Sequence, residues 1–477
     1  MFDKEYFNSE EFRELLSNYE ESVAAGQPAF LDADDFVDIA DYYNMQGETE
    51  RANDTVDYAL SLYPSATLLN VFKARRALER YDFDDARRYL SAIDDHDSPD
   101  YHYLKAEVLI AEDRLDEADE YLRQYSLSVP ADEHDDFIKD VINLYVDYDA
   151  SEKAYQWVLR AHDDTSDDFM ELMGRTLFGL GKYQDSQRVF NELIDRHPFS
   201  TVYWNALASA QFMDEDYPGA VTSSEYAIAI DPSDSEGLMT KACSLFRMGN
   251  FEQAADYFAR YVKAVPDGDI TYALLHQGVC MVNLNRSADA LPLLQQALAV
   301  SAPDSELLPQ IHEEMAFCYG ALRKPEEAMA ALDNTESLEC DHVQTMVIRG
   351  HILLENGLPE RAEHYFKQAM RQSNHDPSVI VRIIVSLYDN HLVKASYFMF
   401  KKLFSSSASS QLTEGFAYMA LCCHDLGYAD EFLHYLQVAV ERNPQEAHQV
   451  LAPLFPDSMP VSEYVAFTKE MFRKYRQ

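Results

Sequence analysis

A small residue recurs at a nearly constant spacing along almost the whole chain. One series consists of Ala or Ser at steps of 32 to 38 residues: Ala52, Ala86, Ala118, Ala154, Ser186, Ala220, Ala254, Ala290, Ala328, Ala362 and Ser396. A second series of Ala or Gly lies 12 residues earlier: Ala40, Ala74, Ala106, Gly174, Ala208, Ala242, Gly278, Ala316 and Gly350. Two small residues per repeat predict two helices that cross closely. Such a chain folds as a solenoid of stacked repeats rather than as a globule around one core.

One repeat, residues 201–234, shows how the pattern is built. Trp204 and Leu207 follow helical spacing and predict the first helix, which a polar turn separates from a second one. Pro232 ends the second helix, because proline lacks an amide hydrogen and disfavours helix in the residue before it. The next repeat has the same pattern at a shift of 34 residues, and Gly249 stands where a helix C-terminus needs a left-handed residue.

These repeats resemble tetratricopeptide repeats, whose pattern is W-x2-L-G-x2-Y, a Gly at the turn, and then Y/F-x2-A-x3-F-x2-A-x4-P. The residues of this one repeat that match the pattern directly are Trp204, Leu207, Tyr217, Ala220, Ala227 and Pro232. Other repeats match in part, and the register gives twelve of them, which start near residues 33, 67, 99, 135, 167, 201, 235, 271, 309, 343, 377 and 413. Repeats 4, 11 and 12 match least well.

The predicted fold class is all-α, an α-solenoid of about twelve helix–turn–helix repeats over residues 33–446. The resemblance implies that the solenoid is right-handed. Residues 1–32 are expected to form an N-terminal capping helix, and residues 447–477 a C-terminal one. Such terminal elements cover the apolar faces that the first and last repeats would otherwise expose.

The chain is strongly acidic, with 39 Lys and Arg against 83 Asp and Glu and a formal net charge of −44. Residues 1–200 alone hold 19 basic and 47 acidic residues. We expect no nucleic-acid partner, because binding depends on Lys and Arg that neutralise phosphates, and no anionic membrane surface for the same reason. The charge keeps an elongated body soluble, or it attracts a basic partner.

The N-terminal sequence has no basic region followed by an apolar one, so it does not read as a secretory signal. The sequence also contains no apolar run of about 18 residues, the length that a membrane span needs. The six Cys residues form no CxxC pair, which argues against a disulfide framework or a zinc site. We therefore expect a cytoplasmic protein.

The chain shows no motif for catalysis. Gly179 to Lys182 resembles part of a phosphate-binding loop, but the complete motif is missing and Gly181 has a simpler role as the turn between two helices. The acidic run of residues 32–41 lacks the Gly and the terminal Glu of a calcium loop. We therefore expect no enzyme activity, no cofactor and no metal.

The resemblance implies a concave groove, which in this family is lined by positions 2, 5, 9 and 12 of each first helix and binds extended or helical peptides. Transferring these positions gives the candidate groove residues Asp34, Asp100, Asp136, Lys139, Asn143, Asp168, Arg175, Asn205, Phe212, Phe246, Val279, Phe317, Leu354, Val385 and Tyr388.

The same positions differ in charge between the two ends of the chain. In the first five repeats ten of the twenty are charged: Asp34, Asp41, Arg75, Asp100, Glu107, Asp136, Lys139, Asp168, Glu171 and Arg175. In the last five only Glu313 and Glu414 are charged, whereas twelve are apolar or aromatic: Tyr272, Leu275, Val279, Val282, Phe317, Val347, Leu354, Val381, Val385, Tyr388, Ala417 and Leu421. Two interpretations remain open. The apolar positions are ordinary helix-packing residues, or the groove is bipartite and fits a partner with a basic and a hydrophobic segment.

The leading functional hypothesis is a non-catalytic scaffold that binds a protein or peptide in this groove. One known mode of the family, a clamp for a chaperone's terminal carboxylate, is not expected. Lys139 and Asn143 match its first two positions, but Leu172, Val202 and Ala206 stand where the next three are needed. Two alternatives are a structural subunit or homodimer that docks through the solenoid ends, and an accessory subunit of an enzyme complex.

Overall fold

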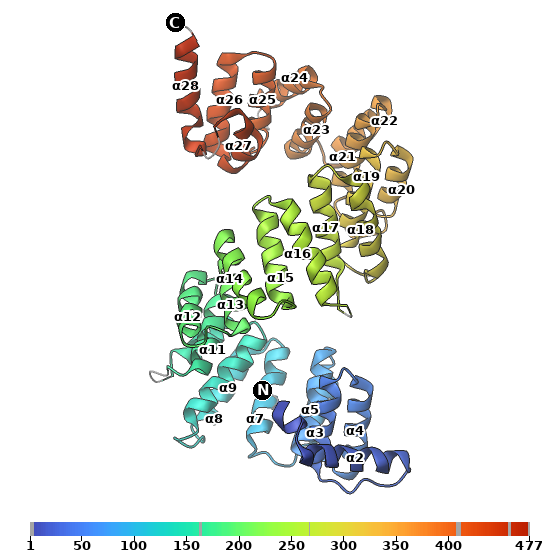
Figure 1. Cartoon of the computed structure of the whole chain (residues 1–477), viewed down its shortest axis with the longest axis vertical. Coiled ribbons are helices and arrows are strands. Elements are labelled where there is room, and N and C mark those ends of the chain that lie inside the picture. The colour runs from blue at the N-terminus through green and yellow to red at the C-terminus, as the bar shows by residue number, and fades with distance from the viewer. Residues whose placement is uncertain (1–3, 162–164, 267, 407–411, 457–458, 476–477) are drawn as a thin grey trace. The chain divides into compact units, whose positions relative to one another are not determined.

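In the computed structural model the chain is a succession of short helices joined by tight turns (Figure 1). The structure describes residues 4–161, 165–266, 268–406, 412–456 and 459–475, and within these ranges it contains no β-strand. The chain divides into two compact parts, an N-terminal part, Met1–Ile230, and a C-terminal part, Asp231–Gln477. We describe each part by itself.

The N-terminal part begins with α1 (Lys4–Phe7) and α2 (Glu10–Ala24) and continues with six helix pairs. We call the first helix of each pair the A helix and the second the B helix. The pairs are α3 (Ala33–Met45) and α4 (Thr49–Leu62), α5 (Thr67–Glu79) and α6 (Phe83–Ala92), α7 (Pro99–Ala111) and α8 (Leu115–Ser126), α9 (His134–Asp147) and α10 (Ser151–Val158), α11 (Asp167–Gly179) and α12 (Tyr183–Arg196), and α13 (Thr201–Met213) and α14 (Tyr217–Ile230).

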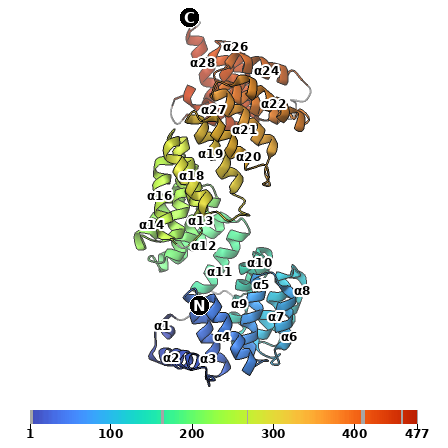
Figure 2. The ribbon, with the colours of Figure 1, turned by 90° about the vertical axis from the view of Figure 1, so that its right-hand side faces the viewer.

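The C-terminal part holds six more pairs and then two terminal helices (Figure 2). The pairs are α15 (Ser235–Arg247) and α16 (Phe251–Ala264), α17 (Thr271–Asn283) and α18 (Ser287–Val300), α19 (Leu308–Ala321) and α20 (Pro325–Asp333), α21 (His342–Glu355) and α22 (Pro359–Gln372), α23 (Pro377–Asp389) and α24 (Val393–Phe404), and α25 (Phe416–Asp425) and α26 (Ala429–Arg442). The terminal helices are α27 (Pro444–Leu451) and α28 (Tyr464–Tyr475). The predicted α-solenoid of helix pairs is confirmed.

The periodic small residues lie where the two helices of each pair cross. Every Ala and Ser of the B-helix series, from Ala52 to Ser396, has an exposed fraction of 0%. The two serines also bond to the partner helix, because the Ser186 hydroxyl donates to the Gly174 carbonyl at 2.9 Å and the Ser396 hydroxyl donates to the Ile384 carbonyl at 3.3 Å. The spacing of small residues in the sequence is therefore the spacing of the helix crossings.

Three A helices carry glycine at the crossing because a bulky side chain of the B helix occupies the space. A β-carbon on Gly174 would lie 2.8 Å from the Phe190 ring, and one on Gly350 would lie 2.2 Å from the Phe366 ring. At Gly278 the obstacle is Leu294 at 2.8 Å. The A helix can therefore approach the B helix only where it lacks a side chain.

The turn between the A and B helices contains a residue with positive φ in every pair. Glycine fills this position in some pairs, at Gly47, Gly181, Gly249, Gly357 and Gly427, as predicted for Gly249. The other pairs use a residue with a side chain: Tyr81, Asp113, Asp149, Glu215, Asn285, Arg323 and His391. Glycine adopts this backbone conformation without a steric penalty, whereas the other residues do so at a cost.

At the N-terminal end, the expected helix is α2. The Ser9 hydroxyl accepts a hydrogen bond from the Phe12 amide at 3.1 Å and caps the helix. The Phe12 side chain is fully buried, and the Tyr19 hydroxyl donates to Thr55 of the first repeat at 3.0 Å.

At the C-terminal end the structure differs from the single capping helix predicted over residues 447–477. Two helices follow the last pair, because Asn443 and Pro444 start a new helix directly after α26. The Asn443 side chain accepts from the Glu446 amide at 3.0 Å, and proline suits the first turn, where its missing amide is not needed. The last A helix also starts at Phe416 rather than near 413, after Gly415 at φ 84°.

Candidate binding grooves

Equivalent residues of neighbouring A helices contact one another in the N-terminal part. The Arg75 side chain on α5 donates to Glu107 on α7 at 2.9 Å, and Arg175 on α11 donates to Asn143 on α9 at 3.2 Å. In both cases the two residues are 32 positions apart, which is one repeat. The A helices from α3 to α11 therefore lie side by side, and their exposed sides form one surface, which we call the N-terminal A-helix face.

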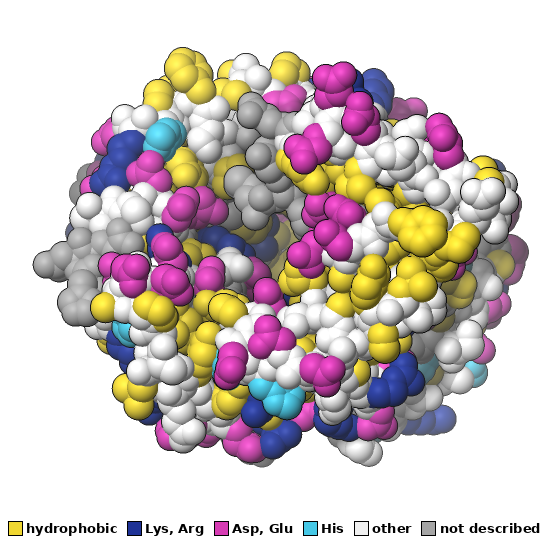
Figure 3. Space-filling model, turned by 90° about the horizontal axis from the view of Figure 1, so that it is seen from below, with side chains coloured by type: hydrophobic (Ala, Val, Ile, Leu, Met, Phe, Trp, Pro, Cys, Tyr) yellow, Lys and Arg dark blue, Asp and Glu magenta, His cyan; other side chains and the backbone are white. Residues whose placement is uncertain are grey.

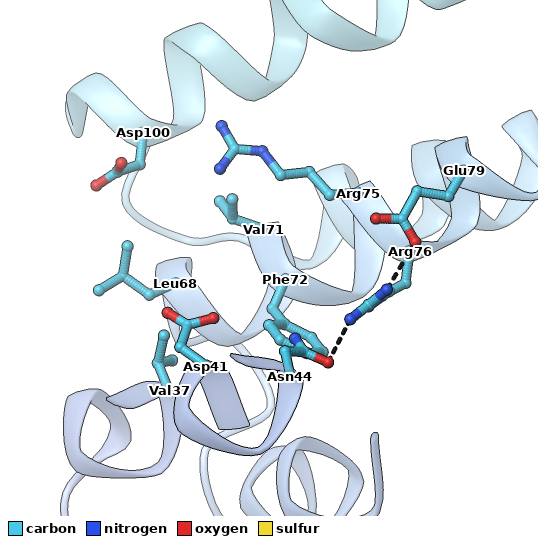
Figure 4. A pocket seen from close by; sticks show the side chains of 10 residues that line it. All are labelled: Val37, Asp41, Asn44, Leu68, Val71, Phe72, Arg75, Arg76, Glu79 and Asp100. Carbon is cyan, nitrogen blue, oxygen red and sulfur yellow. Dashed lines mark hydrogen bonds and ion pairs between the residues drawn. The ribbon is translucent and has the colours of Figure 1, made fainter. Parts of the chain in front are cut away.

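A pocket of about 320 Å³ opens on this face between α3, α5 and α7 (Figure 4). Its lining consists of Val37, Asp41, Asn44, Leu68, Val71, Phe72, Arg75, Arg76, Glu79 and Asp100. We call it the α3–α5 pocket. Seven of these residues occupy positions 2, 5, 9 or 12 of their A helices, the positions expected to line a groove: Val37, Asp41, Asn44, Leu68, Val71, Arg75 and Asp100. Sequence reasoning missed Phe72, Arg76 and Glu79, which lie one position further along α5.

Three carboxylates and two guanidinium groups line the α3–α5 pocket. Burial raises the pKa of Asp41 to about 6, and nearby Asp38 adds to this rise, whereas Arg75 and Arg76 oppose it. The two arginines are held by other residues. Arg75 pairs with Glu107, and Arg76 pairs with Glu79 at 2.8 Å and also donates to Asn44. Neither Asp41 nor Asp100 has an ion-pair partner among the described residues.

A second pocket, of about 580 Å³, continues along the same face and shares Arg75 and Glu79 with the first. Its other lining residues include Glu107, Asp147 and Tyr148. The Tyr148 hydroxyl donates to Glu107 at 3.2 Å, and burial raises the pKa of Tyr148. Carboxylates outnumber basic side chains in the lining of both pockets.

Several other predicted groove residues of the N-terminal part are bonded to one another. Lys139 pairs with Asp136 at 2.7 Å, and Asp147 pairs with Arg175 at 2.9 Å and accepts from Asn143, also at 2.9 Å. The two basic side chains are thus neutralised within the protein. Asp34 and Asp168 are exposed and, like Asp100, have no ion-pair partner among the described residues.

Two candidate groove residues offer little surface to a partner. Asn205 on α13 is 3% exposed, and Val279 on α17 is 9% exposed and belongs to a hydrophobic core. Both lie on A helices, but the helices packed against them cover their side chains. The remaining candidates of α13 and of the C-terminal part are half-buried: Phe212, Phe246, Phe317, Leu354, Val385 and Tyr388.

The apolar groove positions of the C-terminal part have two roles. Several are core residues that contact the neighbouring repeat, namely Leu275, Val279, Val347, Val381 and Ala417, all 9% exposed or less. The others retain some surface, and Tyr272 is 40% exposed. The helix-packing interpretation therefore accounts for part of the charge contrast seen in the sequence.

Aromatic side chains gather on the A helices of the C-terminal part. Phe246 on α15 lies 5.5 Å from the His276 ring of α17, which stacks on Tyr272 at 3.9 Å. On α23, the Tyr388 hydroxyl donates to Asp425 at 2.7 Å, and its ring lies 6.0 Å from Tyr418. These rings form a half-buried apolar surface, which we call the C-terminal A-helix face.

Figure 3 shows one face of the molecule, on which Asp and Glu side chains are interspersed with hydrophobic ones. Among the described residues, no group of three or more His, Cys, Asp or Glu has an arrangement suited to a metal ion. No helix in the described ranges is long and apolar enough to cross a membrane.

A family model described as a tetratricopeptide repeat matches residues 73–128, 171–235 and 239–306. These segments overlap the helix pairs from α5 to α8 and from α11 to α18. The chain contains tetratricopeptide repeats. The resemblance inferred from the residues is thereby confirmed. Repeat 4, which matches the sequence pattern poorly, lies between two of the matched segments. Residues beyond 306 form the same helix pairs without a family match.

Solved structures resemble parts of this chain. YrrB, described as having an unusual peptide-binding site, is 16% identical, with 38% of this chain and 91% of YrrB aligned and a TM-score of 0.34. MamA is 18% identical, the alignment covers 37% of this chain and 94% of MamA, and the TM-score is 0.34. A tetratricopeptide repeat protein from Parabacteroides merdae is 15% identical, the alignment covers 53% of this chain and 98% of that protein, and the TM-score is 0.39. No curated protein matches the sequence.

Tetratricopeptide repeats are in general scaffolds for protein interactions, and the family match indicates no enzyme family. This repeat protein therefore belongs, at the coarsest level, to the class of proteins that bind other proteins or peptides.

Proposed function

We propose that this protein is a non-catalytic scaffold that binds a protein or peptide partner on its A-helix faces. The N-terminal A-helix face takes a basic segment, and the C-terminal A-helix face takes a hydrophobic one. The observation that carries the proposal is the α3–α5 pocket, an open cavity lined by seven residues at the expected groove positions. A groove that served only to pack the repeats would be filled by side chains.

The charge of the N-terminal face supports a basic segment. Asp34, Asp100 and Asp168 are exposed on three A helices and lack ion-pair partners among the described residues. Because their field adds to that of the other carboxylates, a basic segment is attracted before contact. This attraction speeds association and weakens as salt screens exposed charges over about 10 Å at 0.1 M.

The half-buried rings of the C-terminal face support a hydrophobic segment. Phe317 and Val385 are partly accessible on α19 and α23, although their neighbours on the same helices are core residues. Apolar surface that a partner covers is removed from water, which stabilises the complex by about 25 cal/mol per Å². This contact sets the dissociation rate more than the association rate.

The test starts with peptides selected from a random display library on the full chain, followed by surface plasmon resonance. Replacing Asp100, Asp136 and Asp168 with Asn slows association of basic peptides at low salt, and the difference disappears at high salt. Replacing Phe317 and Val385 with Ser speeds dissociation of apolar peptides at any salt. The control is Glu50→Gln with Asp54→Asn, which removes two exposed charges from the B helix α4. If both groove variants bind like the wild type, the partner uses another surface and the proposal is wrong.

A further inference from the structure

The α3–α5 pocket combines an apolar wall with carboxylates from different helices. We propose that it receives a single basic side chain, arginine or lysine, of the partner segment on the N-terminal A-helix face. The proposal rests on the function proposed above and names the chemical group that this part of the face recognises.

Two carboxylates from separate helices line the pocket. Asp41 lies on α3 and Asp100 on α7, and both are drawn at the pocket lining in Figure 4. Neither has an ion-pair partner among the described residues. Since a guanidinium or ammonium group presents several donors, it can bond to carboxylates on two sides at once.

The protein's own arginines neutralise these carboxylates only in part: Arg75 and Arg76 lower the pKa of Asp41, but neither forms an ion pair with Asp41 or Asp100. The Arg75 side chain donates to Glu107 at 2.9 Å, outside the pocket lining. The Arg76 side chain donates to Glu79 at 2.8 Å and to Asn44, and its guanidinium carbon lies 5.5 Å from the centre of the Phe72 ring. Each guanidinium group thus has a carboxylate partner other than Asp41 and Asp100, and these two carboxylates are left for one further cation.

The apolar wall suits the methylene stem of a basic side chain. Val37, Leu68 and Val71 line the pocket beside Asp41, and Val71 is buried while the other two are half-buried. Lysine and arginine pack their stems on apolar surface and keep the charged head at a polar group. A purely apolar side chain would leave the half-buried Asp41 carboxylate without a partner, and an acidic one would be repelled.

The experiment uses saturation-transfer difference NMR on the full chain with three nine-residue Gly/Ser peptides. Their central residue is arginine, lysine or citrulline, the uncharged analogue of arginine. We expect the arginine and lysine peptides to bind at least tenfold more tightly than the citrulline peptide. The Asp41→Asn/Asp100→Asn variant loses this difference, whereas the control Glu50→Gln/Asp54→Asn, which removes the same charge from the B helix α4, retains it. The relative affinity of the first two peptides shows which head group the pocket prefers.

The pH dependence supplies an independent readout. The charged groups around Asp41 are Asp38 on α3, Arg75, Arg76 and Glu79 on α5, and Asp100 on α7. With a pKa of about 6 for Asp41, binding of the arginine peptide weakens about fourfold between pH 7.5 and 5.5, as the carboxylate takes up a proton. In the Asp41→Asn variant, binding of the arginine peptide does not weaken in this way between pH 7.5 and 5.5.

Equal binding of the arginine and citrulline peptides to the wild type would overturn the proposal, and so would unchanged binding in the double variant. If that variant does not fold, Leu68→Trp, which fills the pocket without changing charge, replaces it and is expected to abolish the preference for arginine. A different result distinguishes failure of this proposal from failure of the proposed function. Basic display-selected peptides whose binding weakens in the Asp100→Asn/Asp136→Asn/Asp168→Asn variant, but not when the pocket is filled by Leu68→Trp, would support the proposed function and exclude the pocket as the site of the basic side chain.

Discussion

At the scale of single residues, the turn between the A and B helices needs a residue with positive φ, and a residue with a side chain adopts this conformation only at a cost. Glu215 adopts φ 63° between α13 and α14, and its amide donates to the Phe212 carbonyl at 3.1 Å. A residue with a β-carbon in this region costs roughly 1–2 kcal/mol relative to a right-handed conformation. Gly249 performs the same turn in the next repeat at φ 78° without this cost.

We therefore expect Glu215→Gly to stabilise the N-terminal part by about 0.5 kcal/mol, because the relief of strain exceeds the extra entropy that glycine gives the unfolded chain. The reverse change, Gly249→Glu, lowers stability by about 1 kcal/mol. Thermal unfolding followed by circular dichroism measures both. A lower melting temperature for Glu215→Gly would show that its side chain makes a contribution larger than the strain.

The raised pKa of Asp41 leads to a second prediction at this scale, which concerns the pH dependence of stability. Its folded-state pKa of about 6 lies above the usual aspartate value of about 3.8, so the folded state holds the proton more firmly than the unfolded state does. Stability due to this group is therefore present below pH 4 and is lost as the pH rises through 6. Asp41→Asn, which cannot ionise, melts at a higher temperature than the wild type at pH 7.5, and the gap closes towards pH 4. A constant gap across this range would contradict the raised pKa. A carboxylate kept at a cost in stability fits a binding role.

At the scale of helices, the sequence predicts the A and B helices well because the crossing distance constrains residue size. Ala220 and Ala254 could be placed from spacing alone, since any larger residue would push the two helices apart. The extra helix α27 was missed because it lies outside the repeat pattern, and its only local signal is Asn443 followed by Pro444. Capping chemistry, rather than periodicity, defines it.

The last helix, α28, depends on one buried ring. Tyr464 is 1% exposed, its ring stacks on Phe455 at 3.8 Å, and its hydroxyl lies 3.2 Å from the His448 ring nitrogen. Tyr464→Ala should destabilise the C-terminal part by about 3–5 kcal/mol, as other buried aromatic deletions do. Tyr464→Phe, which keeps the ring, should cost only about 0.5–1.5 kcal/mol. Chemical unfolding gives both values. A small loss in Tyr464→Ala would mean that α28 does not cap the last pair.

For the molecule as a whole, the sequence predicts which face a residue belongs to but not how deeply the residue lies. The period placed Asp41, Leu68 and Asp100 at one pocket because they occupy groove positions in successive repeats. It gave groove positions to Val279 and Asn205 as well, yet both are buried. Depth depends on how closely each A helix packs against the next, which depends on side chains in two repeats together.

The distribution of charge over the two parts leads to the last prediction. Residues 1–230 hold 19 Lys and Arg and 51 Asp and Glu, whereas residues 231–477 hold 20 and 32. Like charges destabilise a folded body by mutual repulsion, and salt screens them over about 10 Å at 0.1 M. Since each repeat contacts mainly its neighbours, the two parts open separately. Raising KCl from 0.02 to 0.3 M should therefore slow amide hydrogen exchange in α5 and α7 more than in α19 and α21, as measured by mass spectrometry. Equal slowing of exchange in the two parts would mean that ion pairs such as Arg75–Glu107 already offset the repulsion. The carboxylates of the N-terminal A-helix face would then cost the protein no stability.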